Sequence, residues 1–88
     1  MKLHGEFVVR QVMDTTVAIP IGQTALLMNA MILLNDVSKV IWGCLEQGND
    51  LESIVTAVTD AFEVSADEAR TDITDFCDKL RKVQLLEE

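Results

Sequence analysis

Two stretches near the N-terminus have the period-two pattern of half-buried strands. β-branched residues are dense in residues 6–13, and large apolar side chains occupy every second position of residues 16–21. Residues 14 and 15, which lie between these two stretches, predict a turn. Because Pro20 has no amide hydrogen to donate to a ladder, we expect the second strand to lie at a sheet edge or to end there.

A continuous apolar run follows in residues 25–34 and predicts a third strand, which includes residues 31–34. A run without alternation is typical of a strand that is covered on both faces. We therefore expect three strands in one small antiparallel sheet before the helical part of the chain begins.

From residue 36 onwards, apolar residues recur at spacings of three and four, which predicts helices with one buried face. The first predicted helix covers residues 36–47 and stops at Gly48, a common residue after a helix C-terminus. The second begins near Asn49. The third begins at Ser65, which forms a capping box with Glu68 three residues later.

The third helix is expected to end near Val83, so that Leu85 and Leu86 pack into the core. Three strands followed by three helices predict an α+β fold. The last two helices, joined by the short link 63–64, suit a winged helix-turn-helix arrangement. At this length we expect one domain over residues 1–88.

Acidic side chains outnumber basic ones by 15 to 7, and the formal net charge is −8. Such a chain repels nucleic acid at long range, and the third predicted helix carries more acidic than basic residues before its last turn. The first residues lack the cationic and then apolar pattern of a signal peptide, so we expect none, and the longest apolar run is too short to span a bilayer. We therefore expect a cytoplasmic protein with no nucleic-acid or membrane partner.

Residue types that carry enzymatic chemistry are few. Cys44 and Cys77 fall on apolar helix faces, where free cysteines usually behave as small buried hydrophobic residues. With His4 as the single histidine, the chain lacks the usual four-ligand set of a structural metal site and a base placed beside either cysteine. It also lacks a glycine-rich phosphate loop and a GxSxG motif. We expect no catalysis, no metal and no cofactor.

Recognition of a peptide or a protein is the function class that remains. A small sheet exposes at least one edge, and such an edge accepts an extended peptide as an added strand. Alternatively, a loop or a second copy covers the edge, so both a monomer and a dimer fit the sequence. The other functions left open are a winged-helix transcriptional regulator and a structural oligomerisation module.

The joint between the third strand and the first helix resembles a segment of the PqqD family, LN-x-[VT]-[GAS]-x-x-IW. Residues 34–42 carry this segment, and further matching positions extend over nearly the whole chain. They are Leu45, Gly48, Ala61, Phe62, Asp72, Ile73, Phe76, Leu80, Leu85 and Leu86. The sequence departs from the family at Ser38, where Gly or Ala is more usual, and at Gln84, where Gly is common.

This resemblance implies a PqqD-like RiPP recognition element, a small non-catalytic module. Such proteins bind the leader segment of a ribosomally synthesised precursor peptide and present its core to a maturation enzyme. The enzyme expected as a further partner is a radical SAM protein, a protease or a cyclase. The leader is expected to lie as an extra strand along the third strand, in a groove shared with the third helix.

The resemblance also places the peptide-binding site. The backbone of residues 28–33 is expected to bond the leader, through the positions Met28, Ala30, Met31, Ile32 and Leu33. On a helical wheel, one stripe flanks the core face of the third helix and is expected to line the groove. Its members are Arg70, Thr74, Cys77 and Arg81.

Each of these residues is given a role and an alternative. Arg70 and Arg81 are expected to pair with acidic leader residues, and Cys77 is expected to line an apolar pocket with Met31. The alternative for the two arginines is a solvated helix face with partners one turn away. For Met28 and Met31 the alternative is plain core.

Overall fold

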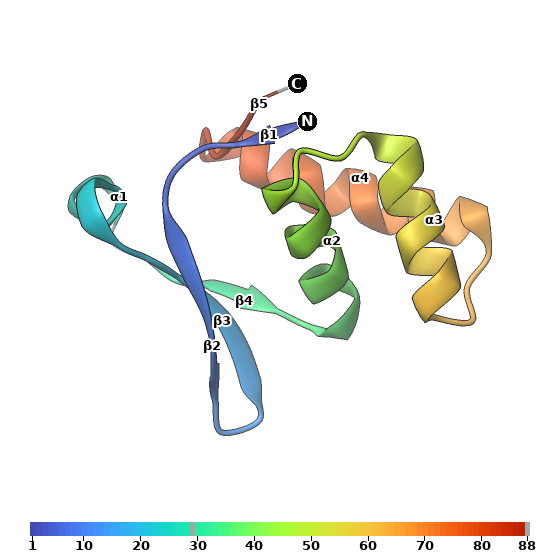
Figure 1. Cartoon of the computed structure of the whole chain (residues 1–88), viewed down its shortest axis with the longest axis horizontal. Coiled ribbons are helices and arrows are strands. Elements are labelled where there is room, and N and C mark those ends of the chain that lie inside the picture. Colours follow the sequence, from blue (N-terminus) through green and yellow to red (C-terminus); the bar gives the residue numbers. More distant parts are fainter. Residues whose placement is uncertain (29, 88) are drawn as a thin grey trace. The chain divides into compact units, whose positions relative to one another are not determined.

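The computed structural model describes residues 1–28 and 30–87 and has an α+β fold, as predicted (Figure 1). The chain divides into two compact units. Residues 5–36 form a sheet unit, and residues 1–4 together with residues 37–88 form a helical unit. None of the described helices is both long enough and apolar enough to cross a membrane.

The sheet unit contains the predicted three-stranded antiparallel sheet. Its strands are β2 (Phe7–Val12), β3 (Thr15–Pro20) and β4 (Ile32–Leu34), in the order β2-β3-β4. The β2–β3 hairpin pairs without interruption from Phe7↔Pro20 to Val12↔Thr15, and β3 pairs with β4 from Thr16↔Leu34 to Ala18↔Ile32. Val17, Ala18 and Leu34 are buried.

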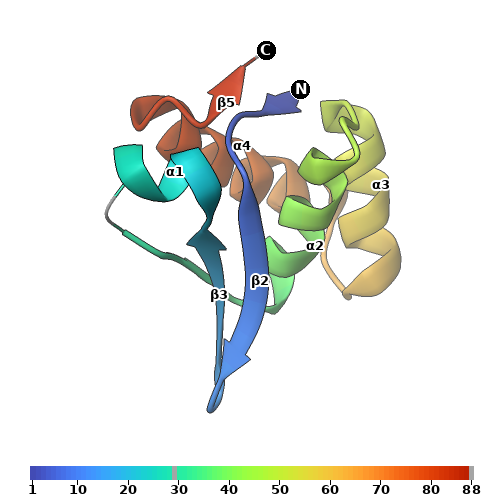
Figure 2. The ribbon, with the colours of Figure 1, turned by 60° about the vertical axis from the view of Figure 1, so that its left-hand side comes forward.

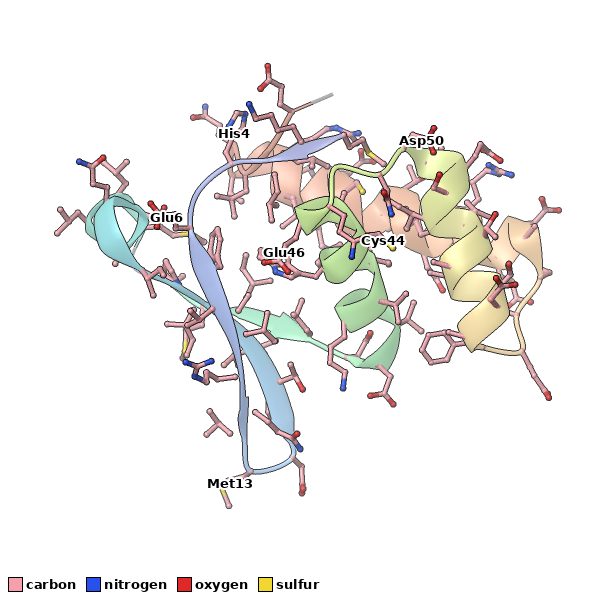
Figure 3. All side chains as sticks on the ribbon, in the orientation of Figure 1. His4, Glu6, Met13, Cys44, Glu46 and Asp50 are labelled. Carbon is pink, nitrogen blue, oxygen red and sulfur yellow. The ribbon has the colours of Figure 1, made fainter. Side chains whose placement is uncertain are left out.

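The turn of this hairpin lies one residue earlier than predicted. Val12 and Thr15 form the closing pair, so Met13 and Asp14 make the loop, and Met13 is the residue at its tip in Figure 3. Met13 has a φ of 58°. Two-residue hairpin loops favour a positive φ at the first position because that geometry matches the right-handed twist of the strands.

The third strand occupies only the end of the apolar run 25–34, as β4, and the start of this run is helical. Residues Gly22–Leu27 form a short helix, α1, and Met28 is its C-cap. Ala, Leu and Gln are good helix formers, and a continuous apolar run does not distinguish strand from helix by its period. Asn29, inside the predicted ladder segment, lies outside the described residues.

The helices of the helical unit are α2 (Asp36–Glu46), whose first residue still belongs to the sheet unit, α3 (Leu51–Ala61) and α4 (Ala66–Lys82). Two N-caps fix where the last two helices begin. The Ser53 amide donates to Asp50 Oδ1 at 2.9 Å, and the Glu68 amide donates to Ser65 Oγ at 3.1 Å. The second of these bonds confirms half of the predicted capping box.

Helices α2 and α4 end in the same way, in a Schellman motif with a residue of left-handed conformation. This residue is Gly48 after α2, with a φ of 76°, and Gln84 after α4, with a φ of 64°. In α4 the amide of Gln84 donates to the Arg81 carbonyl at 3.0 Å, and the amide of Leu85 donates to the Leu80 carbonyl at 2.9 Å.

The first residues of the chain pair with the last described ones, which the sequence did not predict. Strand β1 (Lys2–Leu3) is antiparallel to β5 (Leu86–Glu87), and Figure 2 shows the two side by side. The His4 amide donates to the Leu85 carbonyl at 2.7 Å, and His4 Nε2 lies 2.9 Å from Glu87 Oε2. Leu85 and Leu86 are buried, as predicted.

Candidate functional site

The β4 strand has one side on which no strand is paired within residues 1–28 and 30–87. The Ile21 amide donates to the Glu6 carbonyl at 2.9 Å, which fixes the alternation of the hairpin ladder. In an antiparallel pair every second residue bonds its partner, so residues 16 and 18 of β3 direct their backbone groups towards β4. Their partners in β4, Leu34 and Ile32, therefore direct their N–H and C=O groups towards β3. It follows that the N–H and C=O of Leu33 face the open edge.

Apolar side chains flank this open stretch of backbone. Leu33 is 69% exposed and Met31 is 59% exposed, whereas Ile32 between them is half-buried. Upstream, Ala30 is exposed, and Met28 is half-buried with an extended backbone (φ −132°, ψ 122°). The described part of the predicted 28–33 segment therefore combines an open β edge with side chains that are unusually exposed for their type.

Helix α1 adds two exposed leucines that the sequence analysis did not single out. Leu26 and Leu27 are 85% and 90% exposed, and no residue of α1 is buried. The Glu6 amide donates to Thr24 Oγ1 at 2.7 Å, which connects α1 to the start of β2. A signal for this surface was present in the sequence, because residues 15–35 contain no charged residue in a chain that is 25% charged.

Arg70, on α4, lies against α3. Its Nη1 donates to Glu52 Oε2, and its Nη2 lies 3.4 Å from Glu52 Oε1. The hydrogen bond and the charge of Glu52 raise the pKa of Arg70. The partner is thus on a neighbouring helix, and the guanidinium is already paired with a carboxylate.

The other predicted members of the α4 stripe lie in different surroundings. Arg81 Nη1 donates to Asp78 Oδ1 at 3.0 Å, and its Nη2 lies 3.6 Å from the Met1 sulfur. Cys77 is 2% exposed, in the core of the helical unit, whereas Thr74 is exposed. The stripe therefore contains two ion-paired cations, an exposed hydroxyl and a buried thiol.

The Arg70–Glu52 pair also shows which flank of α4 faces α3. On a helical wheel, the opposite flank of the core stripe contains Phe76, which is half-buried, and Val83, which is exposed. A wheel drawn from the sequence alone has two equivalent flanks. Only the position of the neighbouring helix distinguishes them.

The residues suited to metal binding or nucleophilic catalysis are scattered. Among the described residues, no three His, Cys, Asp or Glu side chains are grouped so as to hold a metal ion. His4 and Cys44 lie on separate segments, as Figure 3 shows, and His4 pairs with Glu87.

The fold and this edge define a class: a small α+β protein with an open strand beside exposed apolar side chains. The model of the family described as "Coenzyme PQQ synthesis protein D (PqqD)" matches residues 12–86. The chain belongs to this family, which confirms the resemblance found in the sequence.

A solved structure is similar over almost the whole chain. It is described as "TbiB1 in Complex with the TbiA(beta) Leader Peptide", and it shares 28% sequence identity with this chain at a TM-score of 0.74. The alignment covers 99% of this chain and 95% of that one. No curated protein matches the sequence.

Proposed function

We propose that this chain is a RiPP recognition element that binds the leader segment of a ribosomally synthesised precursor peptide. The observation that carries the proposal is the open β4 edge, where the Leu33 backbone and the exposed side chains of Leu33 and Met31 lie together. Membership of the PqqD family supports it, and so does the similarity to a protein whose structure was solved with a leader peptide.

The leader binds by strand addition in this proposal. An extended segment lies beside β4, accepts a hydrogen bond from the Leu33 N–H and donates one to the Leu33 C=O. Residues 28–31 then extend the ladder. Each bond contributes ~0.5–1.5 kcal/mol net and is largely independent of sequence, so specificity comes from the side chains that meet Met31 and Leu33.

Residues of α4 supply further contacts in this proposal. The cations Arg70 and Arg81 receive acidic leader residues, which compete with Glu52 and Asp78 for the guanidinium groups. Thr74 offers a hydroxyl. Cys77 contributes only if the leader opens the core around it, because the thiol is buried in the free chain.

The bound leader places the rest of the precursor at a maturation enzyme. We assign the covalent chemistry to this partner, which the family resemblance implies to be a radical SAM protein, a protease or a cyclase. Precursor peptides are made on ribosomes, so we place the encounter in the cytoplasm.

An NMR titration of the labelled chain tests the proposal, with leader peptides from small open reading frames beside its gene. We expect the largest amide shifts at residues 31–34 and a second set on α4. A scrambled peptide of the same composition is the control. Shifts spread evenly over the chain, or none with any leader, would contradict leader recognition.

A further inference from the structure

The sheet has a second outer strand, β2, which is longer than β4. It has six residues against three, and its residues from Val9 to Val12 are all exposed. The Ile21–Glu6 bond shows which residues of β2 form backbone hydrogen bonds with β3. Every second residue does so, and these are residues 8, 10 and 12. The backbone groups of Val9 and Gln11 therefore point away from the sheet. The Val9 carbonyl accepts a hydrogen bond from Arg10 Nη1 at 3.3 Å, an exposed bond that a second strand would replace.

Strand β2 carries few of the devices that protect a sheet edge from pairing. Such devices include proline, β-bulges, several charges or a very short strand. The register with β3 is one-to-one along its whole length, the strand has no proline, and Arg10 is its one charged residue. Within the described residues no other strand pairs with its outer side.

The sequence of β2 is complementary to itself in one antiparallel register. With a two-fold axis at Val9, this residue stands opposite the partner's Val9, and both direct their N–H and C=O groups across the axis. Arg10 then stands opposite the partner's Val8, and Phe7 opposite the partner's Gln11. No two like charges face each other, and the central cross-strand pair is of two β-branched side chains.

The charge distribution favours contact between two copies of the chain through their sheet units. Three acidic residues and one basic residue fall in residues 5–36, so the sheet unit carries −2 of the chain's net charge of −8. The remaining −6 lies on the helical unit. The sheet unit is therefore the less charged of the two, and like-charge repulsion is weaker between two sheet units than between two helical units.

We propose that β2 pairs with the β2 strand of a second copy of this chain, centred on Val9. The two sheets join into one six-stranded antiparallel sheet, and a β4 strand remains at each end. Each dimer thus keeps two open β4 edges. The dimer does not depend on leader binding, because the two edges belong to different strands.

Charge substitution at the symmetry axis tests both the dimer and its register. In sedimentation velocity we expect a concentration-dependent dimer for the native chain. Val9→Lys and Val9→Glu should each give a monomer, because each places two like charges face to face. An equimolar mixture of the two variants should restore the dimer through Lys–Glu pairing across the axis.

Further measurements distinguish a dimer through β2 from a dimer through the exposed leucines of α1. In the double variant Leu26→Ser, Leu27→Ser the dimer should persist, and hydrogen exchange of the Val9 and Gln11 amides should slow as the chain concentration rises. A native chain that is monomeric at NMR concentrations would overturn the proposal. So would a mixture that fails to dimerise, or a dimer lost with the α1 leucines. Leader-induced shifts at Val9 in a monomer would assign the edge to peptide instead.

Discussion

Gly48 and Gln84 occupy equivalent positions with different side chains. Both follow a helix with a positive φ, and both close a Schellman motif. A side chain costs roughly 1–2 kcal/mol in the left-handed region, whereas glycine adopts it freely. At position 84 glycine is common in the family, and this chain has Gln84 instead. The left-handed backbone at this position explains why glycine is favoured there.

Replacement of Gln84 by glycine should stabilise the chain. We expect Gln84→Gly to raise the free energy of unfolding by about 1 kcal/mol, because relief of the left-handed strain exceeds the added chain entropy. Urea denaturation measures the difference. Gly48→Ala is the matched control and should lower stability by a similar amount. An unchanged midpoint for Gln84→Gly would show that the motif tolerates the side chain without cost.

The Asp50 cap should make the stability of α3 depend on pH. The Ser53 amide that donates to Asp50 lowers the pKa of this carboxyl, so the stabilisation is present above the pKa of the unfolded chain. It is lost as the pH falls through the lower pKa of the folded chain. Asp50→Ala should therefore lower Tm at neutral pH and have a smaller effect in acid.

Asp50→Asn is the control for this cap, because asparagine keeps the acceptor oxygen and removes the titration. Thermal unfolding at several pH values should give a smaller Tm loss for Asp50→Asn than for Asp50→Ala at neutral pH. If the Asp50→Ala loss were equally large in strong acid, the carboxylate would not be the source of the stabilisation.

At the scale of elements, strand addition to β4 predicts a period of two in the leader. A proline at a leader position whose N–H points at β4 removes a ladder bond, whereas a proline one residue away removes only an outward N–H. We expect the first kind to weaken binding by about tenfold or more and the second to have a smaller effect. Calorimetry along a proline scan of the leader measures this. Equal losses at neighbouring positions would argue against a strand.

The α4 contacts are tested separately. Arg81→Glu should weaken leader binding while the fold remains, because it replaces a cation by an anion beside Asp78. Lys39→Glu on α2 is the control, with the same change of charge at an exposed position outside the proposed site. The two affinities are compared by calorimetry after circular dichroism has checked the folds. Equal affinities would remove Arg81 from the site.

The elements that the sequence predicted correctly depend on local chemistry. Ser65 and Gly48 mark helix ends through bonds to neighbours a few residues away, and the β2–β3 hairpin follows its β-branched pattern. The elements it missed depend on distant contacts. Nothing local to Lys2 and Leu3 indicates a strand, because their partners are Glu87 and Leu86.

The candidate site was predictable in part. The apolar 31–34 segment was placed in a strand correctly, but the sequence could not show that Leu33 would be exposed or that α1 would precede it. The stripe on α4 was chosen from a helical wheel, and a wheel does not show that Arg70 meets Glu52 on α3. Burial and pairing are properties of the packed chain, so they appear only in the structure.

At the scale of the whole molecule, the charge distribution argues against a DNA-binding role. Residues 40–69 contain seven acidic residues and no lysine or arginine, and they include all of α3 and the turn into α4. The turn before α4 and the first turn of α4 are therefore acidic, and Arg70 is the one basic residue of α4 before its last turn. In a winged helix-turn-helix this second helix of the pair is the one that reads DNA.

We expect no association with double-stranded DNA even at low salt, where phosphate contacts are strongest. Fluorescence anisotropy of a labelled duplex measures this, with a basic DNA-binding protein as the positive control. A rise in anisotropy that disappears with added salt would restore the transcriptional regulator as a candidate function.

The short β4 strand has a thermodynamic consequence. We expect a sheet unit whose outer strand has only three residues to have a low local stability and to open in part in the free chain. A ligand that binds only the closed form shifts this local equilibrium by mass action. The leader would then act as the fourth strand of the sheet, and part of its binding energy would be spent on completing the fold of the protein that captures it.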